Sequence, residues 1–264
     1  MNRRGFIVKT GLMAGNLGLL SYAIAQVINL NEAINKSGRQ RMLSQRMAKA
    51  YLQLGLGIEV EQSRKILESS LNSFERQHAE LKNFAPTQDN KQLLSEMEKN
   101  WQQYKKVLLD KQPNQQDARA IMVLNEDVLS IAHKATMQLE AYSGTSMGQL
   151  VNVSGRQRML SQRMAKFYQA QQWGVAPPDV MVKLDAARKD FVAGMTTLQG
   201  APANTARIRE ELALAQQQWL FFDDALGKIA DTRNARQYAI NVATTSERIL
   251  STMDGITSLY QQLA

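Results

Sequence analysis

The string SGRQRMLSQRMAK occurs twice in the chain, at residues 37–49 and 154–166. Each copy carries three arginines, and a guanidinium is a planar, permanently charged group that can donate two parallel hydrogen bonds to one edge of a small anion. The serines of the string could add further donors to such an anion. The residue types therefore indicate anion binding, and the repetition indicates two similar halves of a site.

Helical spacing separates the three arginines of each copy. On an α-helix, one row of side chains repeats with alternating spacings of three and four residues, as in the seam of a coiled coil. This row consists of Leu30, Ile34, Ser37, Arg41, Ser44, Ala48 and Tyr51 in the first copy, and of Met147, Val151, Ser154, Arg158, Ser161, Ala165 and Tyr168 in the second. We expect both helices to pack against another bundle through this seam. A different row carries Asn35, Arg39, Met42, Arg46 and Lys49. We expect that row to face solvent.

An arginine in the middle of a packing seam is costly unless its charge is compensated. If the two seams face each other, Arg41 lies opposite Arg158, and the two guanidiniums repel unless an anion lies between them. Gly38 and Gly155 would let the helices approach closely at this point. The predicted ligand-binding residues are Arg41, Arg158, Ser37, Ser44, Ser154, Ser161, Gly38 and Gly155. The alternative is that each arginine forms a salt bridge with Asp or Glu on a neighbouring helix.

The elements that must position these residues are duplicated as well. The shift of 117 residues that aligns the two strings also aligns Asn35 with Asn152 and Phe74 with Phe191. We therefore expect two units, residues 26–143 and 144–264. Apolar residues in both units repeat every three or four positions between glycine and proline breakers, which is typical of helices. The predicted fold is all-α, with two tandem antiparallel four-helix bundles.

The segment AYSGTSMGQ at residues 141–149 determines how the two bundles are arranged. Its serines and glycines suit a tight turn and a helix N-cap. A tight turn would place the first helices of the two units side by side and parallel, as an intramolecular pseudo-dimer in which Arg41 and Arg158 meet. A continuous helix would instead stack the bundles end to end. We expect the turn, and we also expect N-caps at Thr87 and Asn114.

The composition excludes several classes of function. The chain has no cysteine, so thiolate chemistry and cysteine metal sites are excluded. Its two histidines, His78 and His133, do not have the spacing of a metal site, and His78 lies on an apolar stripe, where we expect it to be a core residue. Phosphate-binding loops and nucleophile motifs are absent. We expect no enzyme activity, no cofactor, no metal and no nucleic-acid partner.

The first 25 residues resemble a bacterial twin-arginine export signal. Arg3 and Arg4 precede an apolar stretch that ends in Ala23-Ile24-Ala25, which fits a cleavage site. Export with cleavage would place the protein in the periplasm, and removal of Arg3, Arg4 and Lys9 would lower its formal charge from +8 to +5. The alternative is an uncleaved segment that anchors the protein in the inner membrane.

The stretches INKSGRQRMLSQRMAK and VNVSGRQRMLSQRMAK resemble the first-helix motif of the periplasmic sensor domains in nitrate/nitrite-responsive histidine kinases of the NarX/NarQ type. They are even more similar to the N-terminal domain of PilJ, the type IV pilus chemotaxis transducer. The pattern Gly-x-x-Arg-Met-x-Ser-x-Arg is met by Gly38, Arg41, Met42, Ser44 and Arg46, and again by Gly155, Arg158, Met159, Ser161 and Arg163. The resemblance implies a dimerising four-helix bundle in which one arginine from each half holds a single nitrate or nitrite, and it assigns that role to Arg41 and Arg158.

We therefore expect a non-catalytic periplasmic sensor or binding protein for a small oxyanion, with nitrate or nitrite as the first candidates. The kinases and transducers carry two membrane helices and a cytoplasmic module that are not seen in this sequence. We therefore expect a separate partner: a membrane sensor kinase, a chemotaxis transducer or a transporter component. The alternative is a helical interaction module for a membrane receptor, a pilus or chemosensory component, or a transporter, without a small-molecule ligand.

Overall fold

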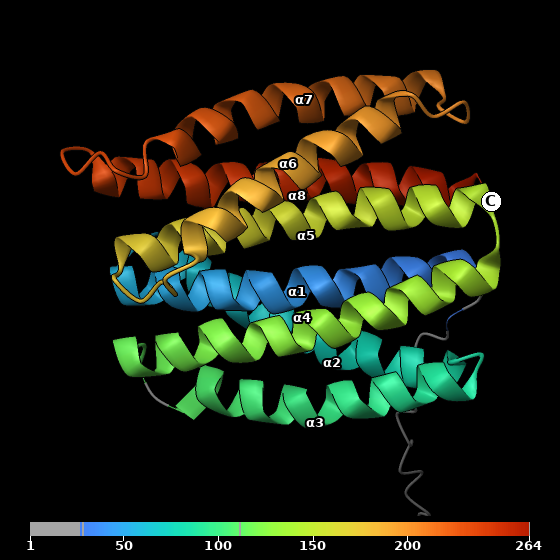
Figure 1. The fold of residues 1–264 in the computed structure, drawn as a ribbon, viewed down its shortest axis with the longest axis horizontal. Coiled ribbons are helices and arrows are strands. Elements are labelled where there is room, and N and C mark those ends of the chain that lie inside the picture. Colours follow the sequence, from blue (N-terminus) through green and yellow to red (C-terminus); the bar gives the residue numbers. More distant parts are fainter. Residues whose placement is uncertain (1–26, 28, 111, 264) are drawn as a thin grey trace, which may run out of the picture.

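The computed structural model describes residues 27, 29–110 and 112–263, so the predicted export signal at residues 1–25 lies outside the described part. The described residues form eight helices and no strand (Figure 1). The helices are α1 (Leu30–Leu56), α2 (Val60–Phe84), α3 (Gln88–Asp110), α4 (Gln115–Ser143), α5 (Ser146–Gln172), α6 (Val180–Gln199), α7 (Ala206–Gly227) and α8 (Ala235–Gln262). The all-α prediction, with four helices in each half, is confirmed. Among these helices, none combines the length and the apolar composition that crossing a bilayer requires.

Local sequence signals account for the helix ends. The side chain of Asn29 accepts a hydrogen bond from the backbone N–H of Glu32 and caps α1, and Gly57 ends this helix in the left-handed region with φ 66°. The predicted N-caps at Thr87 and Asn114 are both formed: Thr87 Oγ1 accepts from the backbone N–H of Asn90 at 3.2 Å, and the Asn114 side chain accepts from that of Asp117 at 3.0 Å.

The turn between α4 and α5 consists of two residues. Gly144 ends α4 with φ 61°, where a glycine avoids backbone strain. Thr145 begins α5 as an N-cap, because its hydroxyl oxygen accepts a hydrogen bond from the backbone N–H of Gly148 at 3.0 Å. The chain therefore reverses direction here, as Figure 1 shows at the right of the molecule. The predicted tight turn is confirmed, and the end-to-end arrangement is excluded.

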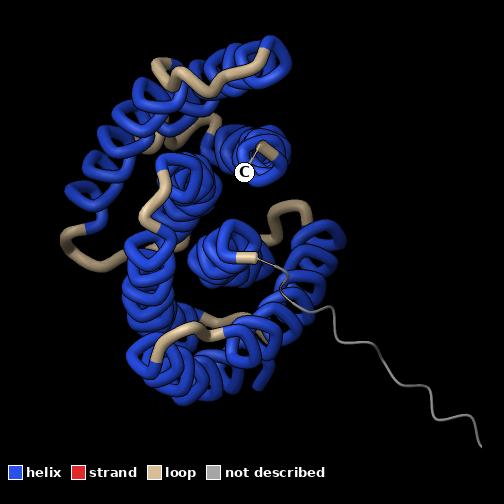
Figure 2. The backbone as a smooth tube through the Cα atoms, turned by 90° about the vertical axis from the view of Figure 1, so that its right-hand side faces the viewer, coloured by secondary structure: helices blue, strands red, loops and turns tan. Residues whose placement is uncertain are grey.

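The reversal places α1 and α5 side by side and parallel at the centre of the molecule, where α4 and α8 flank them (Figures 1 and 2). The four central helices thus form a bundle that combines both halves of the chain. The remaining helices lie outside this bundle: α2 packs on α1, α3 on α4, α6 on α5 and α7 on α8. The pseudo-dimer predicted from the repeat is therefore the observed architecture.

The prediction of a solvent-facing row on the first helix is wrong. Asn35, Met42 and Lys49 are buried, and the side chain of Lys49 is fully inaccessible to solvent. Arg39 and Arg46 are partly buried in ion pairs with α8. The physical reason is that α1 contacts α2, α4, α5 and α8. A helix in a single bundle keeps one face in water, whereas a helix at the centre of two bundles does not.

The outer helices repeat the same aromatic packing in each half. Phe74 stacks on Trp101 with ring centroids 4.2 Å apart, and Phe191 stacks on Trp219 at 4.5 Å. His78 lies next to Phe74 in the first half and is buried, as its place on an apolar stripe predicts. These contacts join the two outer helices of each half to each other, α2 to α3 and α6 to α7.

Candidate functional site

Arg41 and Arg158 meet where α1 lies beside α5. Both side chains are fully buried. A Cβ atom placed on Gly38 would lie 3.0 Å from Arg41 Nη2 and 3.8 Å from Arg158 Nη2, and one placed on Gly155 would lie 3.1 Å from Arg158 Nη2 and 3.8 Å from Arg41 Nη2. The two glycines therefore leave room for two guanidiniums at one level of the helix pair. The structure brings these four predicted site residues together.

Each guanidinium binds an asparagine of the other half. Arg41 Nη2 donates to Asn152 Oδ1 at 2.6 Å, and Arg158 Nη2 donates to Asn35 Oδ1 at 2.7 Å. Side chains on a helix lean toward its N-terminus, so each arginine reaches a position earlier on the parallel partner helix. Both asparagines are missing from the residues predicted for the site. The signal that could have revealed them is their alignment with each other in the repeat.

The four predicted serines do not contact the guanidiniums. Ser44 Oγ donates to the carbonyl of Arg41, and Ser161 Oγ donates to that of Arg158, both at 2.8 Å on their own helices. Ser154 Oγ donates to the carbonyl of Leu150 at 2.8 Å, and Ser37 Oγ is hydrogen-bonded to Thr136 Oγ1 on α4 at the same distance. The structure thus places these hydroxyls in helix and helix–helix contacts.

The two halves differ in what faces each arginine. Because α4 and α8 occupy equivalent places, Glu126 corresponds to Glu247, His133 to Asp254 and Glu140 to Gln261. Arg158 Nη1 forms an ion pair with Asp254, which also binds Arg39. Arg41 Nη1 instead lies 3.3 Å from Nδ1 of His133. Among the described residues, no carboxylate forms an ion pair with Arg41.

Burial lowers the pKa of both arginines. The pKa of Arg41 falls to about 9, because its guanidinium is desolvated and is repelled by Arg158 and Arg156, although the charge of Glu140 opposes this shift. The pKa of Arg158 falls less, to about 10, because Asp254 partly offsets the desolvation. Arg41 is therefore the less well compensated of the two buried cations.

Glu140, the residue of α4 that corresponds to Gln261, is connected to Arg41 through the side chain of Asn152. The Nδ2 atom of Asn152 donates to Glu140, whereas Nδ2 of Asn35 donates to Oε1 of Gln261 at 2.6 Å. Arg41 is thus linked to a carboxylate only through the amide of Asn152. In the second half, the carboxylate of Asp254 pairs directly with Arg158. In the first half, the carboxylate of Glu140 contacts Asn152, which in turn binds Arg41.

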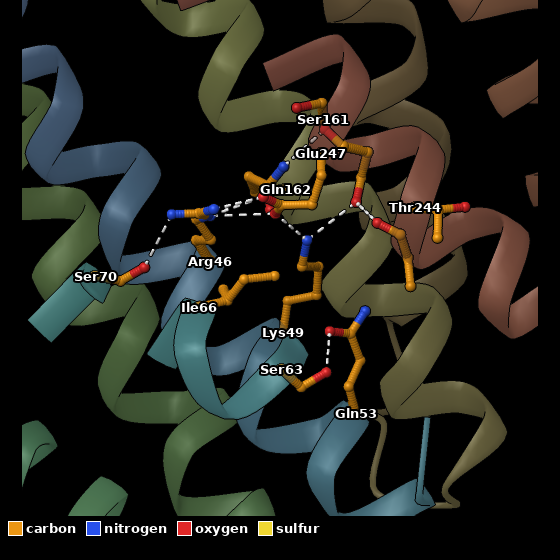
Figure 3. A network of polar contacts seen from close by, with 12 residues as sticks. Arg46, Lys49, Gln53, Ser63, Ile66, Ser70, Ser161, Gln162, Thr244 and Glu247 are labelled. Carbon is orange, nitrogen blue, oxygen red and sulfur yellow. Dashed lines mark hydrogen bonds and ion pairs between the residues drawn. The ribbon is translucent and has the colours of Figure 1, made fainter. Parts of the chain in front are cut away.

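Two further cations of each repeated string bind the fourth helix of the other half. Glu247 on α8 accepts hydrogen bonds from Arg46 and Lys49 of α1 (Figure 3). Glu126 on α4 accepts equivalent bonds from Arg163 and Lys166 of α5. Although burial raises the pKa of Glu247, the charges of Lys49 and Arg46 lower it to about 2. Arg46 and Lys49 therefore hold the two halves together.

Comparison with known families follows the same division of the chain. The sequence profile of the family PilJ, described as the type IV pili methyl-accepting chemotaxis transducer N-terminal domain, matches residues 22–125 and 142–245. Together the matches cover well over half of the chain. The protein belongs to the PilJ family. Each of its two PilJ repeats contains one copy of the thirteen-residue string, and the helices α1 and α5 that carry the string form the contact between the repeats. The searches of curated proteins and of solved structures return no match.

Proposed function

We propose that this PilJ protein is a non-catalytic sensory module of the periplasm, exported by residues 1–25, that binds a small oxyanion at Arg41 beside Arg158. Nitrate and nitrite are the first candidates. The observation that carries the proposal is the state of Arg41, whose guanidinium is fully buried and has no ion-pair partner among the described residues. A buried charge without a partner costs several kcal/mol, of the order of 3–5. An anion at this point would offset that cost.

The hydrogen bonds of Arg41 support an oxyanion as the ligand. The amide oxygen of Asn152 occupies one edge of the guanidinium fork, and Nε of Arg41 has no partner. A planar oxyanion could accept hydrogen bonds from Nη1 of Arg41, as the carboxylate of Asp254 does from Nη1 of Arg158. Such an anion would compete with His133 on α4, whose Nδ1 now lies 3.3 Å from this atom. Binding would therefore loosen a contact between α1 and α4, which gives a route for a signal toward a separate partner protein.

The alternative function, a helical interaction module without a small ligand, is favoured by exposed apolar side chains on the outer helices of the second repeat. Val182 on α6 is 72% exposed, and Leu220 and Phe221 on α7 are 62% and 75% exposed. Exposed apolar residues on outer helices are typical of protein–protein contacts when they are contiguous. Under this alternative, Arg41 and Arg158 serve only the packing of the helices, and anions do not stabilise the folded protein.

Thermal unfolding distinguishes the two functions. Residues 26–264, which include every described helix, are heated in nitrate, nitrite, chloride or sulfate at constant ionic strength. A ligand present at 100 times its Kd adds about 2.7 kcal/mol to the free energy of unfolding, and we expect this gain from nitrate or nitrite but not from sulfate. Arg41→Gln should abolish the gain. Arg188→Gln, which removes an equally charged arginine that pairs with Asp223 on the outer helices, should retain it. Equal melting temperatures in all four salts would favour the interaction module.

A further inference from the structure

The structure contains two equivalent grooves, one on each side of the central bundle. The first lies between α4 and α5, encloses about 240 Å³, and is lined by Arg41, Glu126, Leu129, Ser130, His133, Arg156, Met159 and Arg163. The second lies between α1, α2 and α8, has a volume of about 270 Å³, and includes Arg39, Met42, Arg46, Arg76, Glu247, Leu250, Ser251 and Asp254. Seven residues of the first groove correspond to seven residues of the second, so the two grooves are related by the repeat.

One pair of corresponding residues makes the grooves electrostatically different. The groove between α4 and α5 has three arginines against a single carboxylate, that of Glu126, and it contains His133, whose pKa is lowered by burial and by the charges of Arg41 and Arg156. In the other groove, Asp254 stands where His133 stands in the first and binds both Arg39 and Arg158. The carboxylate of Asp254 is thus an anion attached to the chain, and it occupies the second groove permanently.

The buried arginine of the first groove lacks such an anion. Arg41 lines that groove, and its Nη1 atom faces His133 instead of a carboxylate. Arg156 lies at the rim, where it pairs with Asp190 at 2.6 Å and remains 45% exposed. Arg163 is already bound to Glu126, which Lys166 also contacts. Ser130, His133 and Arg156 are exposed to solvent, so an anion could enter from this side.

We infer that a single small anion of the carboxylate type binds in the α4–α5 groove, held by Arg41 and Arg156 beside His133, in the place that Asp254 takes in the other half. This inference rests on the proposed function and specifies the side of the arginine pair on which the ligand lies. The ligand class follows from the side chain that it replaces: a planar oxyanion with one charge and two oxygens on one edge, such as formate, acetate, nitrite or nitrate. Arg158 keeps its own carboxylate and does not bind the ligand.

The decisive variant is His133→Asp, which gives the first groove the carboxylate that the second already has. The new aspartate would pair with Arg41 and Arg156, so we expect the variant to fold and to melt at a higher temperature than the original protein. Isothermal titration with sodium formate, acetate, nitrite and nitrate should show one anion per chain for the original protein. The same titrations should show at least a tenfold loss of affinity in His133→Asp.

Arg156→Gln and Arg188→Gln form a matched pair, because each removes one arginine from a partly exposed Arg–Asp contact between neighbouring helices. We expect Arg156→Gln to weaken binding at least tenfold and Arg188→Gln to leave it unchanged. Asp254→His should open the second groove and raise the stoichiometry from one anion to two. Arg158→Gln should retain the binding that Arg41→Gln loses.

The outcomes separate the two proposals. If no anion binds to the original protein, both the proposed function and this inference fail. If an anion binds with equal affinity to the original protein and to His133→Asp, the groove assignment is overturned while the proposed function stands. Two anions per original chain, or equal losses in Arg41→Gln and Arg158→Gln, would likewise overturn it, since they would indicate a ligand in both grooves or one shared by both arginines.

Discussion

His78 is a buried residue whose protonation state depends on folding. It stacks beside Phe74 with ring centroids 6.2 Å apart, and neither ring nitrogen has a hydrogen-bond partner among the described residues. Burial lowers its pKa to about 4, although Glu98 partly opposes this shift. The folded protein therefore holds His78 neutral at a pH where the unfolded chain protonates it.

The stability of the protein should consequently fall as the pH decreases from about 6.5 to about 4. In that window the unfolded chain binds more protons at His78 than the folded protein does, so acid favours unfolding. Each unit of pKa difference corresponds to about 1.4 kcal/mol, which gives about 3 kcal/mol for His78 over the whole window. Urea denaturation at pH 7, 5.5 and 4.5 measures the slope. His78→Phe should flatten it markedly, and an unchanged slope in this variant would show that His78 is protonated in the folded state.

At the residue scale, the sequence predicts the central pair of the site but not its surroundings. Arg41 and Arg158 stand out because each is a charge on an otherwise packed seam, and this follows from helical periodicity alone. The contacts of His133 and Asp254 could not be predicted in the same way. They come from fourth helices whose register against the first helices is set by tertiary packing, and a one-turn difference there changes which side chain meets which arginine.

Near the C-terminal ends of α1 and α5, a glycine leaves space for an indole ring. Gly55 lies against Trp173, and a Cβ atom on this glycine would be 2.0 Å from Cη2 of the indole. We expect Gly55→Ala to lower the free energy of unfolding by about 1–3 kcal/mol through overpacking. Gly255→Ala is the matched control, because Gly255 lies within α8, is exposed and would have no atom near its Cβ. It should stabilise the protein by up to about 1 kcal/mol. Equal melting temperatures for the two variants would show that α1 and α5 do not approach closely here.

Helix ends are the elements that the sequence predicts best, because caps and breakers act within a few residues. Thr87 and Asn114 cap helices as expected, and the turn at Gly144 forms where it is predicted. The faces of a helix are harder to assign. The row that contains Lys49 is predicted to face solvent, yet Lys49 is buried against Glu247 of the other half. Periodicity identifies rows of residues, but the number of neighbouring helices decides how many of those rows are buried.

Across the whole molecule, Glu247 connects the two halves, because it lies on α8 and binds Arg46 and Lys49 on α1. Glu247→Gln would leave the fully buried ammonium of Lys49 without its counter-ion, so we expect it to cost about 3–5 kcal/mol of stability. Adding Lys49→Met should recover much of this loss. Denaturant unfolding of the single and double variants forms a double-mutant cycle, and strictly additive losses would show that the pair is not coupled.

The overall arrangement was predictable because the repeat and its short connection leave few topologies. Two identical strings on parallel first helices require the two halves to pack face to face. The difference between the grooves was not predictable from the repeat, because the repeat itself suggests symmetry. Only the aligned fourth helices show that the halves differ at positions 133 and 254.

Gly144 and Thr145 join the two halves in one chain, so the halves can differ in sequence. In a homodimer one gene specifies both partners, so every substitution appears on both sides of the axis. In this chain each half has its own sequence, so His133 can face Arg41 while Asp254 faces Arg158. The covalent link also keeps the halves together at any dilution. Under the proposed function, an anion that binds beside His133 would therefore act on α4, while α8 would keep its ion pair with Arg158.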